Sequence, residues 1–225
     1  MKIQHHLSKR VELPYAAIGF ECQLFLKVYC ADEYIAFIVK HYRICLKLNM
    51  ENFEDILNKD LHQFLLSMNE VDERMPECPD VEGKWEEIAK AYIPDGIREF
   101  QDFPSASLGW MMYVGMAVAK YWDTEWEIYS RLENLYAYIR DKRGYDSMDE
   151  YIREDVLLLK GIDYTVLEKL VGECASRVYN ALRHQNIEPG TKEAFNAYVS
   201  CLHQLYLFGA AMQLNRMGYH MTKMN

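Results

Sequence analysis

The chain has 225 residues, of which 50% are hydrophobic and 26% are charged, and its formal net charge is −9. This length and apolar content suffice for one globular domain with a buried core, and they exclude an intrinsically disordered chain. The negative charge repels phosphate backbones and anionic lipid headgroups, so it argues against a nucleic-acid partner and against a membrane surface.

The cysteines and motifs give no sign of a metal site or a cofactor. The six cysteines contain no C-x-x-C pair, and their spacing fits no zinc pattern. Glu-x-x-His, nucleotide-binding glycine loops and the hydrolase G-x-S-x-G motif are also absent from the sequence. The basic residues near Met1 are not followed directly by the apolar stretch of a signal peptide. We therefore expect a cytoplasmic protein without metal or cofactor.

Residues 1–49 differ from the rest of the chain in charge and in periodicity. They hold seven basic and four acidic residues, whereas the whole chain is acidic. Hydrophobic residues alternate from Phe20 to Cys30, which predicts a short strand, and residues 33–48 have the spacing of a helix. Two interpretations stay open: an N-terminal appendage on an all-α domain of residues 50–225, or an over-extended reading frame whose true start is Met50.

From residue 50 onward, hydrophobic residues recur at helical spacing between turn signals. Pro94 within "IPDG" should end a helix, Ser147 and Glu150 form a capping box, and Thr191 and Gly218 bound the last helix. Asp123 or Thr124 should cap a separate helix that begins at Glu125. The predicted helices cover residues 53–69, 84–92, 105–122, 125–142, 148–160, 164–185 and 192–217, and the helix broken at Pro94 can resume over residues 97–103. These about seven helices with short connections predict a single antiparallel helical bundle or array of the all-α class.

The helix predicted over residues 105–122 is the most apolar. It has no charge from Leu108 to Ala119, which is too short for a membrane span of roughly 20 residues. Only a narrow strip through Tyr113 is polar, so we expect this helix at the centre of the array. Gly115 costs about 1 kcal/mol relative to alanine in a helix, which implies that another helix or a ligand lies against its backbone.

Aromatic and charged residues gather where this helix ends. Tyr113, Lys120, Asp123 and Trp126, with His203 from the last helix, could line a small-ligand or enzymatic pocket. A cation could also bind here through the aromatic faces and carboxylates of Tyr121, Trp122, Asp123, Glu125, Trp126 and Tyr129. The alternative interpretation is a packed helix corner with Asp123 as a cap.

A second candidate is the stretch "RVYNALRH", in which Arg177 and His184 lie seven residues apart on one helix face. This stretch resembles the Arg-x(4–6)-His pattern of HEPN-type helical ribonucleases. The resemblance implies metal-independent RNA cleavage by an Arg and His paired across a dimer. Val178 departs from the family, which places a polar residue after the Arg. The other interpretation is two solvated residues that favour the helix C-terminal dipole.

The leading hypothesis for function is a helical interaction or assembly domain without catalytic activity. The chain contains 17 Tyr, 12 Met and 4 Trp. Aromatic residues and Met are enriched at protein interfaces, so we expect a protein partner or a second copy of the chain.

Overall fold

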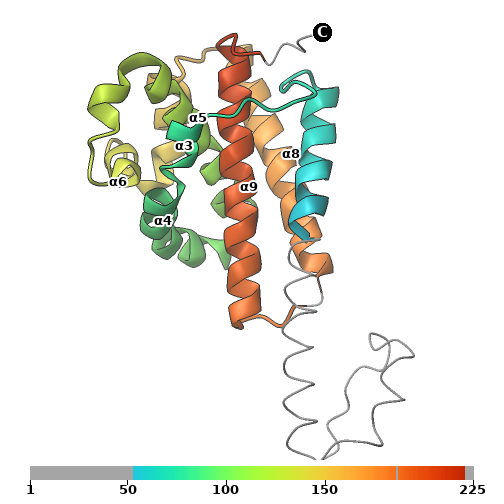
Figure 1. Cartoon of the computed structure of the whole chain (residues 1–225). Coiled ribbons are helices and arrows are strands. Elements are labelled where there is room, and N and C mark those ends of the chain that lie inside the picture. The colour runs from blue at the N-terminus through green and yellow to red at the C-terminus, as the bar shows by residue number, and fades with distance from the viewer. Residues whose placement is uncertain (1–52, 186, 221–225) are drawn as a thin grey trace, which may run out of the picture. The chain divides into compact units, whose positions relative to one another are not determined.

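The computed structural model describes residues 53–185 and 187–220 as a packed array of helices (Figure 1). The all-α class is confirmed, since these residues contain helices and no strand. The strand, helix and start site expected within residues 1–50 lie outside the described residues. In chain order the elements are a helix over residues 53–67, α3 (Pro79–Glu82), α4 (Trp85–Phe100), α5 (Pro104–Tyr129), α6 (Leu135–Arg140), η1 (Tyr145–Ser147), α7 (Met148–Tyr151), the π-helical η2 (Ile152–Val156), α8 (Ile162–His184) and α9 (Lys192–Arg216).

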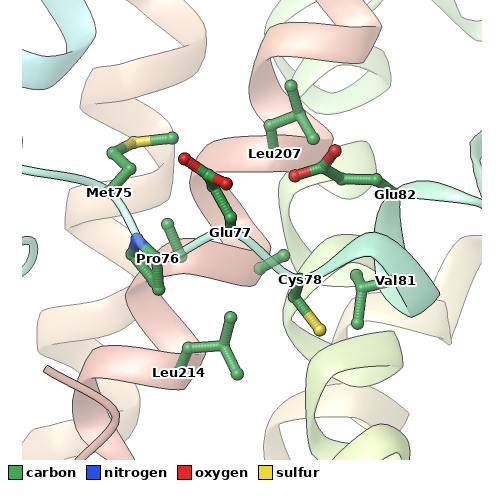
Figure 2. Close-up of a pocket in the computed structure, with 10 residues that line it drawn as sticks. Met75, Pro76, Glu77, Cys78, Val81, Glu82, Leu207 and Leu214 are labelled. Carbon is green, nitrogen blue, oxygen red and sulfur yellow. The ribbon is translucent and has the colours of Figure 1, made fainter. Parts of the chain in front are cut away.

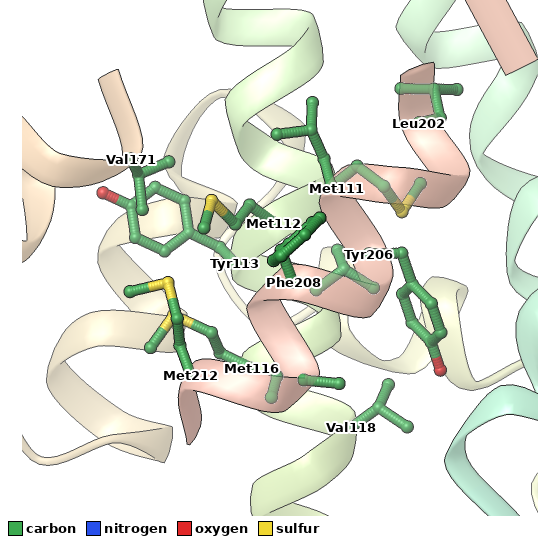
Figure 3. Packing of buried hydrophobic residues seen from close by; sticks show 14 of the residues in the cluster. Met111, Met112, Tyr113, Met116, Val118, Val171, Leu202, Tyr206, Phe208 and Met212 are labelled. Atoms are coloured by element: carbon green, nitrogen blue, oxygen red, sulfur yellow. The ribbon is translucent and has the colours of Figure 1, made fainter. Parts of the chain in front are cut away.

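Helix α5 lies at the centre of the array, as its apolar sequence predicts. Its residues 107–119 are buried except for the half-buried Trp110, and even Tyr113 on the expected polar strip is only 4% exposed. Figure 3 shows its side chains packed against Tyr206 and Phe208 of α9 and Val171 of α8. Within the described part of the chain, none of the helices combines the length and the apolar character that a membrane crossing requires.

The helices of the array run in mixed directions. Ser107 near the start of α5 contacts Tyr198 near the start of α9, and Trp122 near its end contacts Tyr219 just beyond α9, so these two helices are parallel. The 53–67 helix also runs parallel to α9, whereas α8 runs antiparallel to α5. Parallel neighbours need a return between them, and between α5 and α9 the chain returns through α6, α7 and α8.

Helix α4 corrects the expectation that Pro94 ends a helix, because it continues through Pro94 to Phe100. A proline in a helix interior costs about 3 kcal/mol through its missing N–H and its ring. Tertiary contacts on both sides of Pro94 offset this cost. Tyr92 is fully buried before the proline, and after it the carbonyl of Gly96 accepts a hydrogen bond of 2.8 Å from Ser107 Oγ.

The boundaries between residues 123 and 160 also differ from expectation. α5 passes through Asp123 to Tyr129 with a kink at Glu125, and the next helix cap is Asn134, whose side chain accepts a hydrogen bond from the N–H of Ala137. Ser147 makes no capping bond, and a short α7 and η2 replace the predicted 148–160 helix. The prediction for the last helix is confirmed, since Thr191 caps α9.

Candidate functional site

One hollow of the described surface lies between the segment 75–82 and the C-terminal half of α9 (Figure 2). It has a volume of about 170 Å³. A second hollow of about 160 Å³ adjoins it, and the two share Pro76, Glu77, Cys78 and Leu214. We call the two hollows together the Cys78 groove. The first is lined also by Met75, Val81, Glu82, Leu207, Ala210 and Ala211, and the second by Trp122, Tyr219 and His220.

The local sequence explains why a groove forms here. Pro76 and Pro79 keep the segment out of helix until Pro79 occupies the first position of α3, where its missing N–H costs nothing. On α9 the small side chains of Ala210 and Ala211 lie between the larger Leu207 and Leu214. An extended segment thus crosses a helix face whose middle is recessed, and the space between them stays open.

Two hydrogen bonds fix α3 above this face. The buried Tyr206 hydroxyl donates to the carbonyl of Val81 at 2.7 Å, and the Trp122 indole N–H donates to Asp80 Oδ2 at 3.1 Å. Tyr206 belongs to α9 and Trp122 to α5. Helix α3, which forms the roof of the groove, is therefore hydrogen-bonded to both central helices. The groove is therefore preformed in the structure.

The residues after α9 close the far end of the groove. The Tyr219 hydroxyl donates to Asp123 Oδ1 at 2.9 Å, and its ring meets Trp122 edge to face with the centroids 5.4 Å apart. His220 Nδ1 lies 3.1 Å from Asp72 Oδ2. These contacts set Tyr219 and His220 as one wall of the second hollow.

The rim of the groove is acidic. Residues 70–87 contain eight acidic and two basic residues. In Figure 2 the carboxylates of Glu77 and Glu82 lie at the Leu207 end of the hollow, away from Leu214. Glu77 pairs with Arg74 on the surface, whereas Glu82 forms no ion pair with another described residue. The site thus combines an apolar floor with a negative edge.

The second hollow brings together the residue types of cysteine hydrolases. Cys78 and His220 both line it, and His220 contacts the Asp72 carboxylate. However, burial raises the pKa of the Cys78 thiol, and the nearby carboxylates of Asp80 and Glu82 raise it further. A nucleophilic cysteine needs a lowered pKa, so this environment favours binding over covalent catalysis. In the described part of the chain, no cluster of His, Cys, Asp and Glu is arranged to hold a metal ion.

The structure brings together only part of the pocket that the sequence suggested. Lys120 Nζ lies 3.5 Å from Asp123, which also accepts the Tyr219 hydrogen bond at the edge of the groove. Tyr113 instead packs against the Arg153 guanidinium, at 5.4 Å from the ring centroid. His203 stacks on Trp85 with the centroids 4.6 Å apart, and Trp126 packs on the core.

Arg177 and His184 both lie on α8, as predicted, but they have different surroundings. The Arg177 guanidinium contacts the carboxylates of Glu173 at 3.1 Å and Asp60 at 3.5 Å, and it covers the Phe64 ring. His184 is exposed at the end of the helix. The two carboxylates beside Arg177 repel the phosphates of an RNA substrate, so this face is unfavourable for RNA binding.

Sequence reasoning did not find the Cys78 groove. The only signals were the proline-rich acidic loop after residue 74 and the apolar stretch "LYLFGAAMQL" in the last helix. Neither signal indicates that the two segments are in contact, because more than half of the chain separates them in the sequence.

Comparison of the chain with protein-family models, with curated proteins and with solved structures finds no match in any of the three. Function is therefore inferred from the geometry and charge of the groove. A fold class such as a helical array hosts many unrelated functions and does not by itself select one.

Proposed function

We propose that the chain is a helical protein-interaction domain and that the Cys78 groove receives side chains of a partner protein. The observation that carries this proposal is a preformed apolar groove of two adjoining hollows, which no described side chain fills. Exposed apolar surface rimmed by polar residues is typical of interaction sites.

The size of the groove supports a protein segment over a small ligand. Its hollows measure about 170 Å³ and 160 Å³. Small-molecule sites are typically about 300–1,000 Å³ and bury most of the ligand. Two neighbouring shallow hollows instead suit two side chains of one segment, as in peptide recognition through adjacent pockets.

The chemistry of the groove supports binding rather than turnover. Its thiol is held protonated by burial and by Asp80 and Glu82. Its roof is tied down by Tyr206 and Trp122, so little ordering is needed when a partner binds. A site that is ordered before binding loses less conformational entropy on association.

Site-specific photo-crosslinking tests this proposal. The photoreactive residue benzoylphenylalanine is placed at Glu77 on the groove rim, or at the exposed Glu127 on α5 as a matched control. In cells that produce the chain, we expect a protein adduct from the Glu77 position and not from the Glu127 position. Filling the groove with Ala210→Leu should abolish that adduct.

Thermal unfolding of the Ala210→Leu protein checks that the variant is folded. A second blocking variant, Leu207→Asp, changes a half-buried groove residue and covers the case in which Ala210→Leu does not fold. Adducts that survive in the folded blocking variants would contradict the proposal, as would identical adducts from both photoreactive positions.

A further inference from the structure

The stretch of the chain that forms one side of the groove is strongly acidic. The stretch of residues 70–87 holds eight acidic residues against two basic ones, whereas the whole chain has a net charge of −9. This stretch includes the segment that roofs the groove. Charge concentrated beside an apolar site acts mainly on the choice of partner and on the rate of encounter.

Part of this acidic set maintains the fold. Glu70 forms two hydrogen bonds with the Arg216 guanidinium, at 2.8 and 2.9 Å, and Asp80 accepts from Trp122. Asp72 contacts His220. These carboxylates have structural partners and are poorly placed to meet another protein.

The carboxylates of Glu77 and Glu82, at the mouth of the groove, do not have such structural partners. The Glu77 side chain is 73% exposed, and its bond to Arg74 is a surface pair of the kind that contributes little to stability. Glu82 is exposed and has no cationic partner among the described residues. Nearby Lys84 is already engaged by Glu87 at 2.9 Å. The mouth therefore presents two carboxylates that a partner's cation can reach.

The exposed carboxylates of Glu77 and Glu82 lie next to the apolar hollow. Figure 2 shows Glu77 and Glu82 at the Leu207 end of the apolar hollow, and Glu77 lines the second hollow as well. We propose that the groove recognises a cationic segment of a partner protein, with an aliphatic side chain in each hollow and Lys or Arg at Glu77 and Glu82. This inference rests on the proposed function and adds the chemistry of the partner.

Peptide display against the full chain tests the inference. A random peptide library is selected on the immobilised protein, and each enriched peptide is measured on the wild type and on the groove-filling Ala210→Leu variant. We expect the groove-dependent peptides to carry aliphatic residues next to Lys or Arg. Their binding should weaken with added salt, because exposed charges are screened.

Charge variants sharpen the test. In the double variant Glu77→Gln/Glu82→Gln, binding of the selected peptides should weaken about tenfold. The double variant Glu127→Gln/Glu188→Gln loses the same charge at exposed positions outside the groove and should bind like the wild type.

The outcomes separate the two proposals. If the groove-dependent peptides are neutral or acidic, or bind the Glu77→Gln/Glu82→Gln variant unchanged, the inferred cationic partner is wrong while the interaction site stands. If every enriched peptide binds the folded Ala210→Leu variant as well as the wild type, the proposed function itself fails.

Discussion

Gly115 of α5 and Gly209 of α9 each face the backbone of the opposite helix. A Cβ atom on Gly115 would overlap the carbonyl oxygen of Tyr206, and one on Gly209 would overlap that of Met112. The two central helices thus approach as closely as their backbones allow. For Gly115 the sequence left open a helix or a ligand against its backbone, and the structure shows the helix.

Replacing either glycine by alanine should destabilise the protein, because the two backbones must separate to admit a methyl group. We expect Gly115→Ala and Gly209→Ala each to lower the free energy of unfolding by about 1–3 kcal/mol, measured by urea denaturation. Gly172→Ala on α8 is the matched control. Its added Cβ meets nothing within 4 Å, so helix propensity should stabilise it by up to about 1 kcal/mol. Equal effects at all three positions would contradict this account of the α5–α9 contact.

Among the charged residues that the structure describes, Arg153 should be the most costly to remove. Arg153 is only 2% exposed. Its guanidinium pairs with Asp149 at 2.5 Å and lies 4.0 Å from the centroid of the Tyr164 ring. Arg153→Met leaves a partly buried carboxylate unpaired, and we expect a loss of about 3 kcal/mol in urea denaturation. Arg143→Met is the control, since Arg143 pairs with Glu154 at the surface and should contribute far less. A comparable loss in both variants would be inconsistent with a special role for the buried pair.

Cys78 should alkylate slowly at neutral pH. Burial and the nearby Asp80 and Glu82 raise the pKa of its thiol above its usual value, so little reactive thiolate exists at pH 7. Iodoacetamide labelling of the Cys78 peptide, followed by mass spectrometry, should accelerate as the pH rises beyond 9. The Asp80→Asn/Glu82→Gln variant should react faster at a given pH. Fast labelling at pH 7 would show an activated thiol and would reopen the hydrolase interpretation.

His203 should make the fold sensitive to mild acid. Burial lowers the pKa of His203 in the folded protein, although Glu54 and Glu82 oppose this shift. The unfolded chain therefore binds the proton more readily, and the stability from neutral His203 is lost as the pH falls below about 6.5. Between pH 7 and pH 5, His203→Gln should lose less stability than the wild type in thermal melts. His184→Gln, at an exposed helix end, should follow the wild-type profile.

The helices were largely predictable because most of them carry local signals. Thr191 caps α9 and the apolar run of α5 lies in the core, as expected. The failures occur where tertiary contacts outweigh local preference. Pro94 lies inside a helix because the surrounding residues are buried and bonded to α5. Ser147 makes no capping bond because it belongs to η1, which runs directly into α7.

The sequence alone determined the all-α class, the central position of α5 and the acidic character of the chain. These properties depend on periodicity, on length and on composition, which can be read along the chain. Only the tertiary structure decided that residues 75–82 cross α9 over Ala210 and Ala211, and that Tyr113 meets Arg153 rather than Lys120. Contacts between segments so far apart depend on the directions and crossings of the helices, which no local pattern encodes.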